Sequence, residues 1–198
     1  MIYISFATAK TPYVEVLNKF LLPSLEKLNL THDIVYPEDR GSWTNNTQLK
    51  PIIIRDALLK HKQAVIYLDA DATIEYYPEL FDRLQDYDIG VHYFDFYKFW
   101  RNKEGNAKRD ILGGTLYFNY NEKVLAFMEA WIKQTQGNYN DQQSLNIVVT
   151  QWKDKLNIYN LPIEYIAIRK GNFVPPEIKN PCIIHNQVSR KYRNWKKK

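Results

Sequence analysis

Short apolar runs alternate along the chain with longer segments in which apolar residues recur at helical spacing. The short runs predict strands at residues 2–6, 34–36, 64–68, 89–93, 111–118 and 182–185, with extended segments at 158 and 163–168. The helical spacing predicts helices at residues 11–28, 48–61, 80–84, 122–136 and 141–152, and loops at 40–46 and 94–110. Pro23 should kink or split the first helix, because proline removes one backbone hydrogen bond and clashes with the preceding turn.

Strands that alternate with helices are typical of an α/β fold, here with a mostly parallel central sheet flanked by helices. A chain of 198 residues is long enough to bury one sizeable core. No internal repeat or linker divides it, so we expect one compact domain over residues 1–189, followed by a basic tail at residues 190–198.

The basic charge is concentrated at one end of the chain. The sequence carries 27 Lys and Arg residues against 22 Asp and Glu, a net charge of +5. Residues 190–198 hold six of the basic residues and none of the acidic ones, so 21 basic and 22 acidic residues remain in the body. This near-neutral body excludes a basic groove over the whole surface, the usual footprint of a nucleic-acid binder. The tail keeps one alternative open, a module that binds nucleic acid or an anionic membrane surface.

Cysteine content and hydropathy bear on the cellular compartment. The single cysteine, Cys182, excludes an internal disulfide and fits a reducing environment. No apolar run approaches the roughly 20 residues that span a bilayer, and residues 1–10 lack the basic start of a signal peptide. These features predict a cytoplasmic protein.

The sequence VIYLDADAT at residues 65–73 carries the clearest candidate chemistry. An apolar strand delivers two carboxylates, Asp69 and Asp71, at its carboxyl end, where open α/β sheets bind their ligands. Residues i and i+2 of an extended segment point to the same side, so both carboxylates can face one cation. Two carboxylates with open coordination positions suit a hard divalent ion that also holds a diphosphate. The pair at Asp86 and Asp88 precedes its strand and is interpreted as a solvated turn.

Two enzyme families share a strand followed by this acidic motif. Residues 69–73 have the form of the first motif of the haloacid-dehalogenase phosphatases, in which Asp69 would be a nucleophile and Asp71 a general acid. That family needs a later acidic pair to complete its Mg²⁺ site, and after residue 120 the acidic residues stand singly. The first motif of that family also lies close to the N-terminus, whereas here a strand–helix–strand–helix unit precedes residues 69–73. The phosphatase is therefore the alternative enzyme and not the favoured one.

The whole chain resembles the GT-A nucleotide-diphosphosugar glycosyltransferases, in particular the glycogenin-like and capsular-sugar retaining families. The matching pieces, in register over nearly the full length, are Lys50-Pro51, YLDAD at 67–71, GGTLYFN at 113–119, DQQSLN at 141–146, Leu161-Pro162 and IIHNQ at 183–187. Each piece is weak by itself, and their order and spacing carry the resemblance.

The resemblance implies a metal site at Asp69, Asp71 and His185, in which the ion bridges the two phosphates of the donor. His185 ends the late strand where the family places its metal histidine. The other interpretation of His185 is a hydrogen-bonded structural side chain. Imidazole is a softer ligand than carboxylate, which favours Mn²⁺ over Mg²⁺.

The resemblance also implies donor-binding residues. These are Thr8, Ala9 and Asp39 at the nucleoside, Lys50 at a phosphate or the sugar, Arg190 and Lys191 at the diphosphate, and Gly113 and Gly114 in close backbone approach to the sugar. The alternative for Lys50 is a solvated helix lysine, and for the glycine pair a β-bulge. Asp141 is the candidate catalytic carboxylate, which contacts the sugar hydroxyls or acts as general base, or else it only caps its helix.

The implied reaction transfers a sugar from a UDP or GDP donor to an acceptor hydroxyl on a glycan, a lipid-linked glycan, a protein or a nucleic acid. The DQQ and Leu-Pro pieces favour the retaining families. The aromatic and basic segment at residues 94–109 is a candidate lid or acceptor contact, although several of its rings are expected in the core. The tail beyond Tyr192 is left for peripheral membrane contact or an anionic acceptor.

Overall fold

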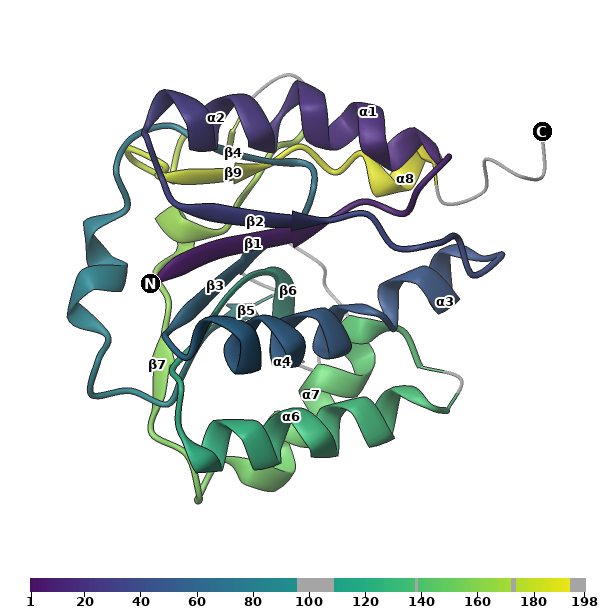
Figure 1. The fold of residues 1–198 in the computed structure, drawn as a ribbon. Helices are drawn as coiled ribbons and strands as arrows, with labels where there is room; N and C mark the ends of the chain where they lie inside the picture. The colour runs from purple at the N-terminus through teal and green to yellow at the C-terminus, as the bar shows by residue number, and fades with distance from the viewer. Residues whose placement is uncertain (96–108, 138, 172–173, 193–198) are drawn as a thin grey trace.

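The computed structural model describes residues 1–95, 109–137, 139–171 and 174–192 (Figure 1). In chain order the strands are β1 (Ile2–Phe6), β2 (His32–Val35), β3 (Val65–Leu68), β4 (Ala72–Ile74), β5 (Ile89–Asp95), β6 (Arg109–Phe118), β7 (Ile158–Asn160), β8 (Ala167–Ile168) and β9 (Ile183–His185). The α-helices are α1 (Pro12–Lys19), α2 (Leu21–Lys27), α3 (Trp43–Thr47), α4 (Lys50–His61), α6 (Glu122–Thr135), α7 (Asp141–Trp152) and α8 (Ser189–Tyr192). Two 3-10 turns lie at Glu79–Arg83 and Ile163–Tyr165.

Six strands form the central sheet in the order β2-β1-β3-β6-β5-β7. The pairs β1–β2, β1–β3 and β5–β7 are parallel, and β6 is antiparallel to both of its neighbours. Five strands therefore run in one direction, which confirms the mostly parallel α/β sheet. A second sheet, β4-β9-β8, holds three short strands.

Both faces of the central sheet are covered, which gives the molecule three layers (Figure 1). Val65 and Tyr67 of β3 pack with α4, α6 and α7 on one face. Ile66 and Leu68 pack with α1, α2 and the small sheet on the other. The alternating side chains of one strand reach two cores, so β3 is apolar at every position.

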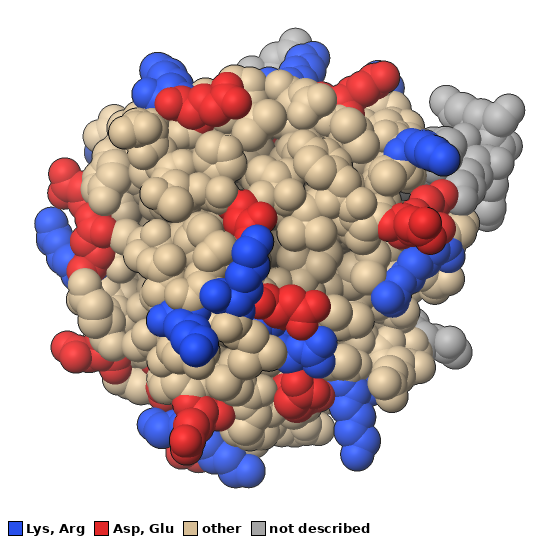
Figure 2. Space-filling model, viewed as in Figure 1, with Lys and Arg blue, Asp and Glu red and all other residues tan. Residues whose placement is uncertain are grey.

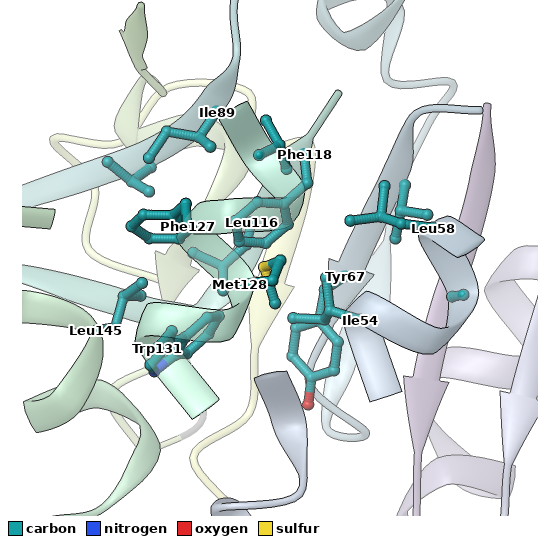
Figure 3. Close-up of a cluster of buried hydrophobic side chains, with 14 of the residues drawn as sticks. Ile54, Leu58, Tyr67, Ile89, Leu116, Phe118, Phe127, Met128, Trp131 and Leu145 are labelled. Atoms are coloured by element: carbon teal, nitrogen blue, oxygen red, sulfur yellow. The ribbon is translucent and has the colours of Figure 1, made fainter. Parts of the chain in front are cut away.

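The larger core lies between the sheet and helices α4, α6 and α7. Figure 3 shows Leu116 and Phe118 of β6 facing Phe127, Met128 and Trp131 of α6. The ring centroids of Phe118 and Trp131 are 6.1 Å apart, within the range of aromatic pairs. This packing fixes the place of α6, against which α7 lies.

The segment expected as one helix over residues 11–28 is split, as Pro23 predicted. The break falls at Phe20, and Pro23 lies in the first turn of α2. Proline is tolerated there because the first backbone N–H groups of a helix have no partner within the helix. A continuous helix would have placed the Pro23 ring against the carbonyl of Lys19.

Three local expectations were wrong. Residues 40–46 are not only loop, because Ser42 caps the short helix α3 by accepting a hydrogen bond from the Asn45 N–H. Strand β4 was not predicted, because it exists through its pairing with β9, 109 or more residues later in the chain. Residues Ile163–Tyr165, which were expected to be extended, form a 3-10 turn. Both ends of the loop expected at 94–110 belong to strands, because β5 reaches Asp95 and β6 starts at Arg109. Residues 96–108 of that loop lie outside the described residues.

Charges of both signs are mixed over the face of the molecule shown in Figure 2. This agrees with the near-neutral body read from the sequence. Within the described part of the chain, no helix is long and apolar enough to cross a membrane.

Candidate functional site

Asp69 and Asp71 lie in the turn that leads from β3 in the large sheet to β4 in the small one. The Asp69 N–H donates to the Gly114 carbonyl at 2.8 Å, and the Ala72 N–H donates to the Asp69 carbonyl at 2.9 Å. These backbone bonds fix the turn at the carboxyl end of the central strand β3, where the sequence placed it.

His185 reaches the acidic pair through strand pairing. Strand β9 runs antiparallel to β4 with Ala72 opposite His185, which sets the imidazole beside Asp71. One potential ligand atom from each of Asp69, Asp71 and His185 lies within 4.8 Å of the other two. The three residues expected to bind a metal are therefore brought together, although 114 positions separate Asp71 from His185.

The chemistry of this cluster fits a divalent cation. The His185 Nδ1 and Asp71 Oδ1 atoms are 3.6 Å apart, which is too long for a hydrogen bond. Two ligands that share one small ion lie about 3.0–3.5 Å apart, given bonds of about 2.1 Å. The second oxygen of Asp71 accepts the Val188 N–H at 2.8 Å, and Asp69 Oδ1 accepts the Tyr67 hydroxyl at 2.9 Å. Such outer bonds orient metal ligands.

Lys50 is buried among acceptors at the first position of α4. Its Nζ donates to the Gly113 carbonyl at 2.9 Å, lies 3.0 Å from Asp69 Oδ1 and pairs with Asp141 Oδ2. Burial by itself would lower the pKa of Lys50, but the carboxylates of Asp141 and Asp69 outweigh it and raise the pKa above its ordinary value. Lys50 is not a solvated helix lysine. Its three N–H groups match three protein acceptors, so it joins the turn that carries Asp69 and Asp71 to α7.

Asp141 is the first residue of α7 and does not cap it. The cap is Asn140, whose side chain accepts the Gln143 N–H while the Gln143 side chain accepts the Asn140 N–H. With the cap supplied by its neighbour, the Asp141 carboxylate is free to pair with Lys50. Asp141 is 5% exposed, so this ion pair is buried.

The two glycines of β6 face different parts of the site. A Cβ on Gly113 would meet Lys50 Nζ at 3.4 Å and Asp141 Oδ2 at 3.5 Å. A Cβ on Gly114 would lie 2.7 Å from His185 Cε1, closer than real side chains approach. The His185 ring therefore lies directly on the backbone of Gly114, a reason for this glycine that the sequence did not reveal.

A cavity of about 540 Å³ lies beside the cluster. Among the candidate residues, Thr8, Lys50, Asp69, Asp71, Gly113 and Asp141 line it. Of the candidates whose side chains the structure describes, Ala9, Asp39, Gly114, His185 and Lys191 do not line it. The Ala9 N–H donates to the Pro37 carbonyl, and Asp39 accepts bonds from the Gly41 N–H and the Asn46 side chain. Lys191 is exposed, with its Nζ 5.2 Å from the Tyr192 ring centroid, and the Arg190 side chain lies outside the described part.

The sequence analysis missed several residues that line the cavity. These are Phe6, Ala7, Tyr13, Trp43, Asn46, Thr47, Tyr67, Ala70, Asp110, Asn140, Gln142 and Gln143. Tyr13 and Trp43 carried a usable signal, since each follows a helix-capping Thr or Ser close behind a strand of the parallel sheet. Burial first, and then the Asp71 and Asp69 carboxylates, raise the pKa of Tyr13 above its ordinary value.

The open, mostly parallel sheet carries two carboxylates after its central strand β3, and a histidine from the second sheet lies beside them next to the cavity. This arrangement defines a glycosyltransferase of the GT-A-like class. Residues 30–197 match the family model of the nucleotide-diphospho-sugar transferases, and the chain belongs to this family. The resemblance seen in the sequence is confirmed.

The fold is also that of a solved enzyme. A glycosyltransferase involved in the glycosylation of the major capsid of PBCV-1 superposes with a TM-score of 0.68 and 13% sequence identity, over 98% of this chain and 97% of that one. No curated protein sequence matches the chain. The family assignment leaves the phosphatase alternative without support.

Proposed function

We propose that the protein is a divalent-metal-dependent glycosyltransferase that moves a sugar from a UDP or GDP donor to an acceptor hydroxyl. The observation that carries this proposal is the Asp69, Asp71 and His185 cluster at the edge of the 540 Å³ cavity. A hard cation held by carboxylates can bind the oxygens of a diphosphate and stabilise its negative charge as it leaves the sugar.

The lining of the cavity supports a donor that lies across the cluster. Phe6, Tyr13 and Trp43 bring aromatic surface from β1, α1 and α3, which suits a nucleobase. Asp110, Asp141 and Gln142 bring carboxylate and amide groups from β6 and α7, which suit sugar hydroxyls. Bound between these groups, Mn²⁺ or Mg²⁺ would supply Lewis-acid stabilisation of the leaving diphosphate.

Residues of this chain orient the donor around that position. Asp69 and Asp71, which line the cavity, would hold the ion. Arg190 and Lys191 would add positive charge as the diphosphate leaves. Lys50 holds Asp69 and Asp141 at a fixed spacing, because its ammonium contacts both.

Asp141 acts on the donor sugar as a hydrogen-bond acceptor. A general base must take up a proton, and a protonated Asp141 would leave the buried Lys50 ammonium with a weakened partner. This cost disfavours Asp141 as the base of an inverting reaction and favours transfer with retention of the anomeric configuration.

The acceptor in this proposal is a hydroxyl of a glycan, a lipid-linked glycan, a protein or a nucleic acid. The proposed location of the protein is the cytoplasm, with peripheral membrane contact through residues 193–198.

A thermal-shift panel of UDP-, GDP- and CDP-sugars, each with and without Mn²⁺, tests the donor and the metal together. One UDP- or GDP-sugar should raise Tm, because a ligand of the native state at 100 times its Kd adds about 2.7 kcal/mol of stability. The rise should appear only when Mn²⁺ is present, because the proposed ion holds the diphosphate. Asp71→Asn should abolish this shift.

Asp86→Asn is the matched control, because Asp86 lies exposed in the second Asp-x-Asp sequence, away from the cavity. It should keep the full shift. The proposal fails if no nucleotide diphosphate binds in the presence of Mn²⁺, or if Asp71→Asn and Asp86→Asn behave alike.

A further inference from the structure

Strand β6 contacts the metal-site histidine with two successive residues. Thr115 lies opposite Leu68 of β3, directly before the acidic turn, and Gly114 precedes it. Both are in contact with the His185 ring, which comes from the other sheet. We call Gly114 and Thr115 the β6 cradle.

Gly114 sets the plane on which the imidazole lies. A Cβ at this position would lie 2.7 Å from Cε1, 2.9 Å from Nδ1 and 3.2 Å from Nε2. All three distances are measured to ring atoms, so no movement of a flexible chain end would relieve the overlap. Only a residue without a side chain allows the ring to lie there.

Thr115 sets the rotation of the ring in that plane. Its Oγ1 lies 2.9 Å from His185 Nε2, and Thr115 is fully buried while His185 is 6% exposed. With Nε2 held by the hydroxyl, Nδ1 is turned towards Asp71 Oδ1 at 3.6 Å. The ring is therefore held at one nitrogen, and the other points into the ligand cluster.

We propose that the β6 cradle positions His185 as a metal ligand, with Thr115 Oγ1 accepting the Nε2 proton so that the Nδ1 lone pair is left for the ion. Gly114 and Thr115 are positioning residues that act through His185. This inference rests on the proposed metal-dependent function, and it assigns to Gly114 a role other than contact with the sugar.

The chemical reason is the proton count of the imidazole. A neutral histidine that binds a metal through Nδ1 must carry its proton on Nε2, and a buried N–H without an acceptor is destabilising. Thr115 removes this cost. Loss of such an outer partner typically weakens metal affinity by about 10–100-fold.

The test of the β6 cradle is a titration of the full chain with Mn²⁺ in the absence of nucleotide. The EPR signal of free Mn²⁺ measures the affinity, so the result does not depend on catalysis. Thr115→Val keeps the shape of the side chain and removes the hydroxyl, and we expect Mn²⁺ affinity to fall about 10–100-fold. Thr115→Ser restores the hydroxyl and should bind close to wild type. Gly114→Ala keeps Thr115 but displaces the ring, so it should also lose affinity.

Thr135→Val is the matched control, because the Thr135 hydroxyl is also buried but donates to the Ile132 carbonyl within α6. It should bind Mn²⁺ like the wild type, with a comparable change in Tm. If the wild type binds Mn²⁺ and Thr115→Val binds equally well, the cradle is overturned while the proposed function stands. If Thr115→Val does not fold, wild-type affinity in Gly114→Ala overturns it. A wild type that binds no Mn²⁺, either alone or with UDP or GDP present, overturns both.

Discussion

At the scale of single residues, the site depends on one buried lysine that is held by several partners. Lys50 contacts Asp69, Asp141 and the Gly113 carbonyl, and its Nζ lies 4.8 Å from the Tyr67 ring centroid. The side chain of Asp141 is 8% exposed and that of Asp69 is 40% exposed, so Asp141 depends on Lys50 far more than Asp69 does. A buried carboxylate without a partner is strongly destabilising.

Lys50→Met should therefore lower the free energy of unfolding by about 3–5 kcal/mol, because it leaves the Asp141 charge uncompensated. The double variant Lys50→Met with Asp141→Asn removes that charge and should recover part of the loss. Denaturant unfolding of both variants measures the difference. A loss below about 1 kcal/mol in Lys50→Met, the range of exposed pairs, would contradict the buried pairing.

At the scale of elements, the first turn of α7 is held from two sides. The capping box between Asn140 and Gln143 closes it, and the Trp131 indole N–H of α6 donates to the Ser144 hydroxyl at 3.0 Å. This turn carries Asp141 and Gln142 into the cavity. The cap thus contributes both to helix stability and to the position of the site.

Asn140→Ala should lower the free energy of unfolding by about 1 kcal/mol, the usual cost of a lost cap, and should also weaken sugar transfer. Asn121→Ala is the control, because Asn121 caps α6 by accepting the Val124 N–H at the far end of the same helix pair. It should destabilise at least as much and leave transfer unchanged. Equal effects of the two variants on transfer would show that the α7 cap has no special role at the site.

At the scale of the whole molecule, the site lies where the two sheets meet. Strands β3 and β6 belong to the large sheet and β9 to the small one, and the chain segment after β9 returns to the acidic turn. The Asn186 side chain donates to the Asp71 carbonyl, the Val188 N–H donates to Asp71 Oδ2, and Tyr192 packs against the second core. Helix α8 runs across residue 190, where the sequence suggested that the domain ends.

Removal of residues 193–198 should consequently leave donor affinity unchanged, because Tyr192, the last residue that the structure describes, already packs on the core. Removal of residues 190–198 should weaken it at least tenfold, because it deletes Arg190, Lys191 and the Tyr192 contact that holds the Val188 segment. Calorimetric titration of both truncated chains with the donor and Mn²⁺ measures this. Equal donor affinity in the two chains would contradict a role for the residues between 190 and 192.

Features set by neighbouring residues were predicted well. The strand and helix periods predicted the α/β sheet, and Pro23 predicted that the first helix is split. The i, i+2 spacing predicted that Asp69 and Asp71 lie together after β3. The family resemblance pointed to Lys50, Gly113 and Asp141, which line the cavity, but their mutual contacts could not be predicted from it. Thr115, Tyr13 and Asn46 were missed, because a threonine in a strand or an aromatic residue in a helix is equally typical of a core.

The sequence by itself determined the α/β class, the acidic turn after β3 and the family, because these depend on local spacing and on the order of motifs. Only the tertiary structure decided that Lys50 joins Asp69 to Asp141 and that β6 holds the His185 ring. Those contacts join residues 19 to 91 positions apart, and they follow from strand register and helix packing. Register is fixed by the burial of whole faces, which no single stretch of sequence records.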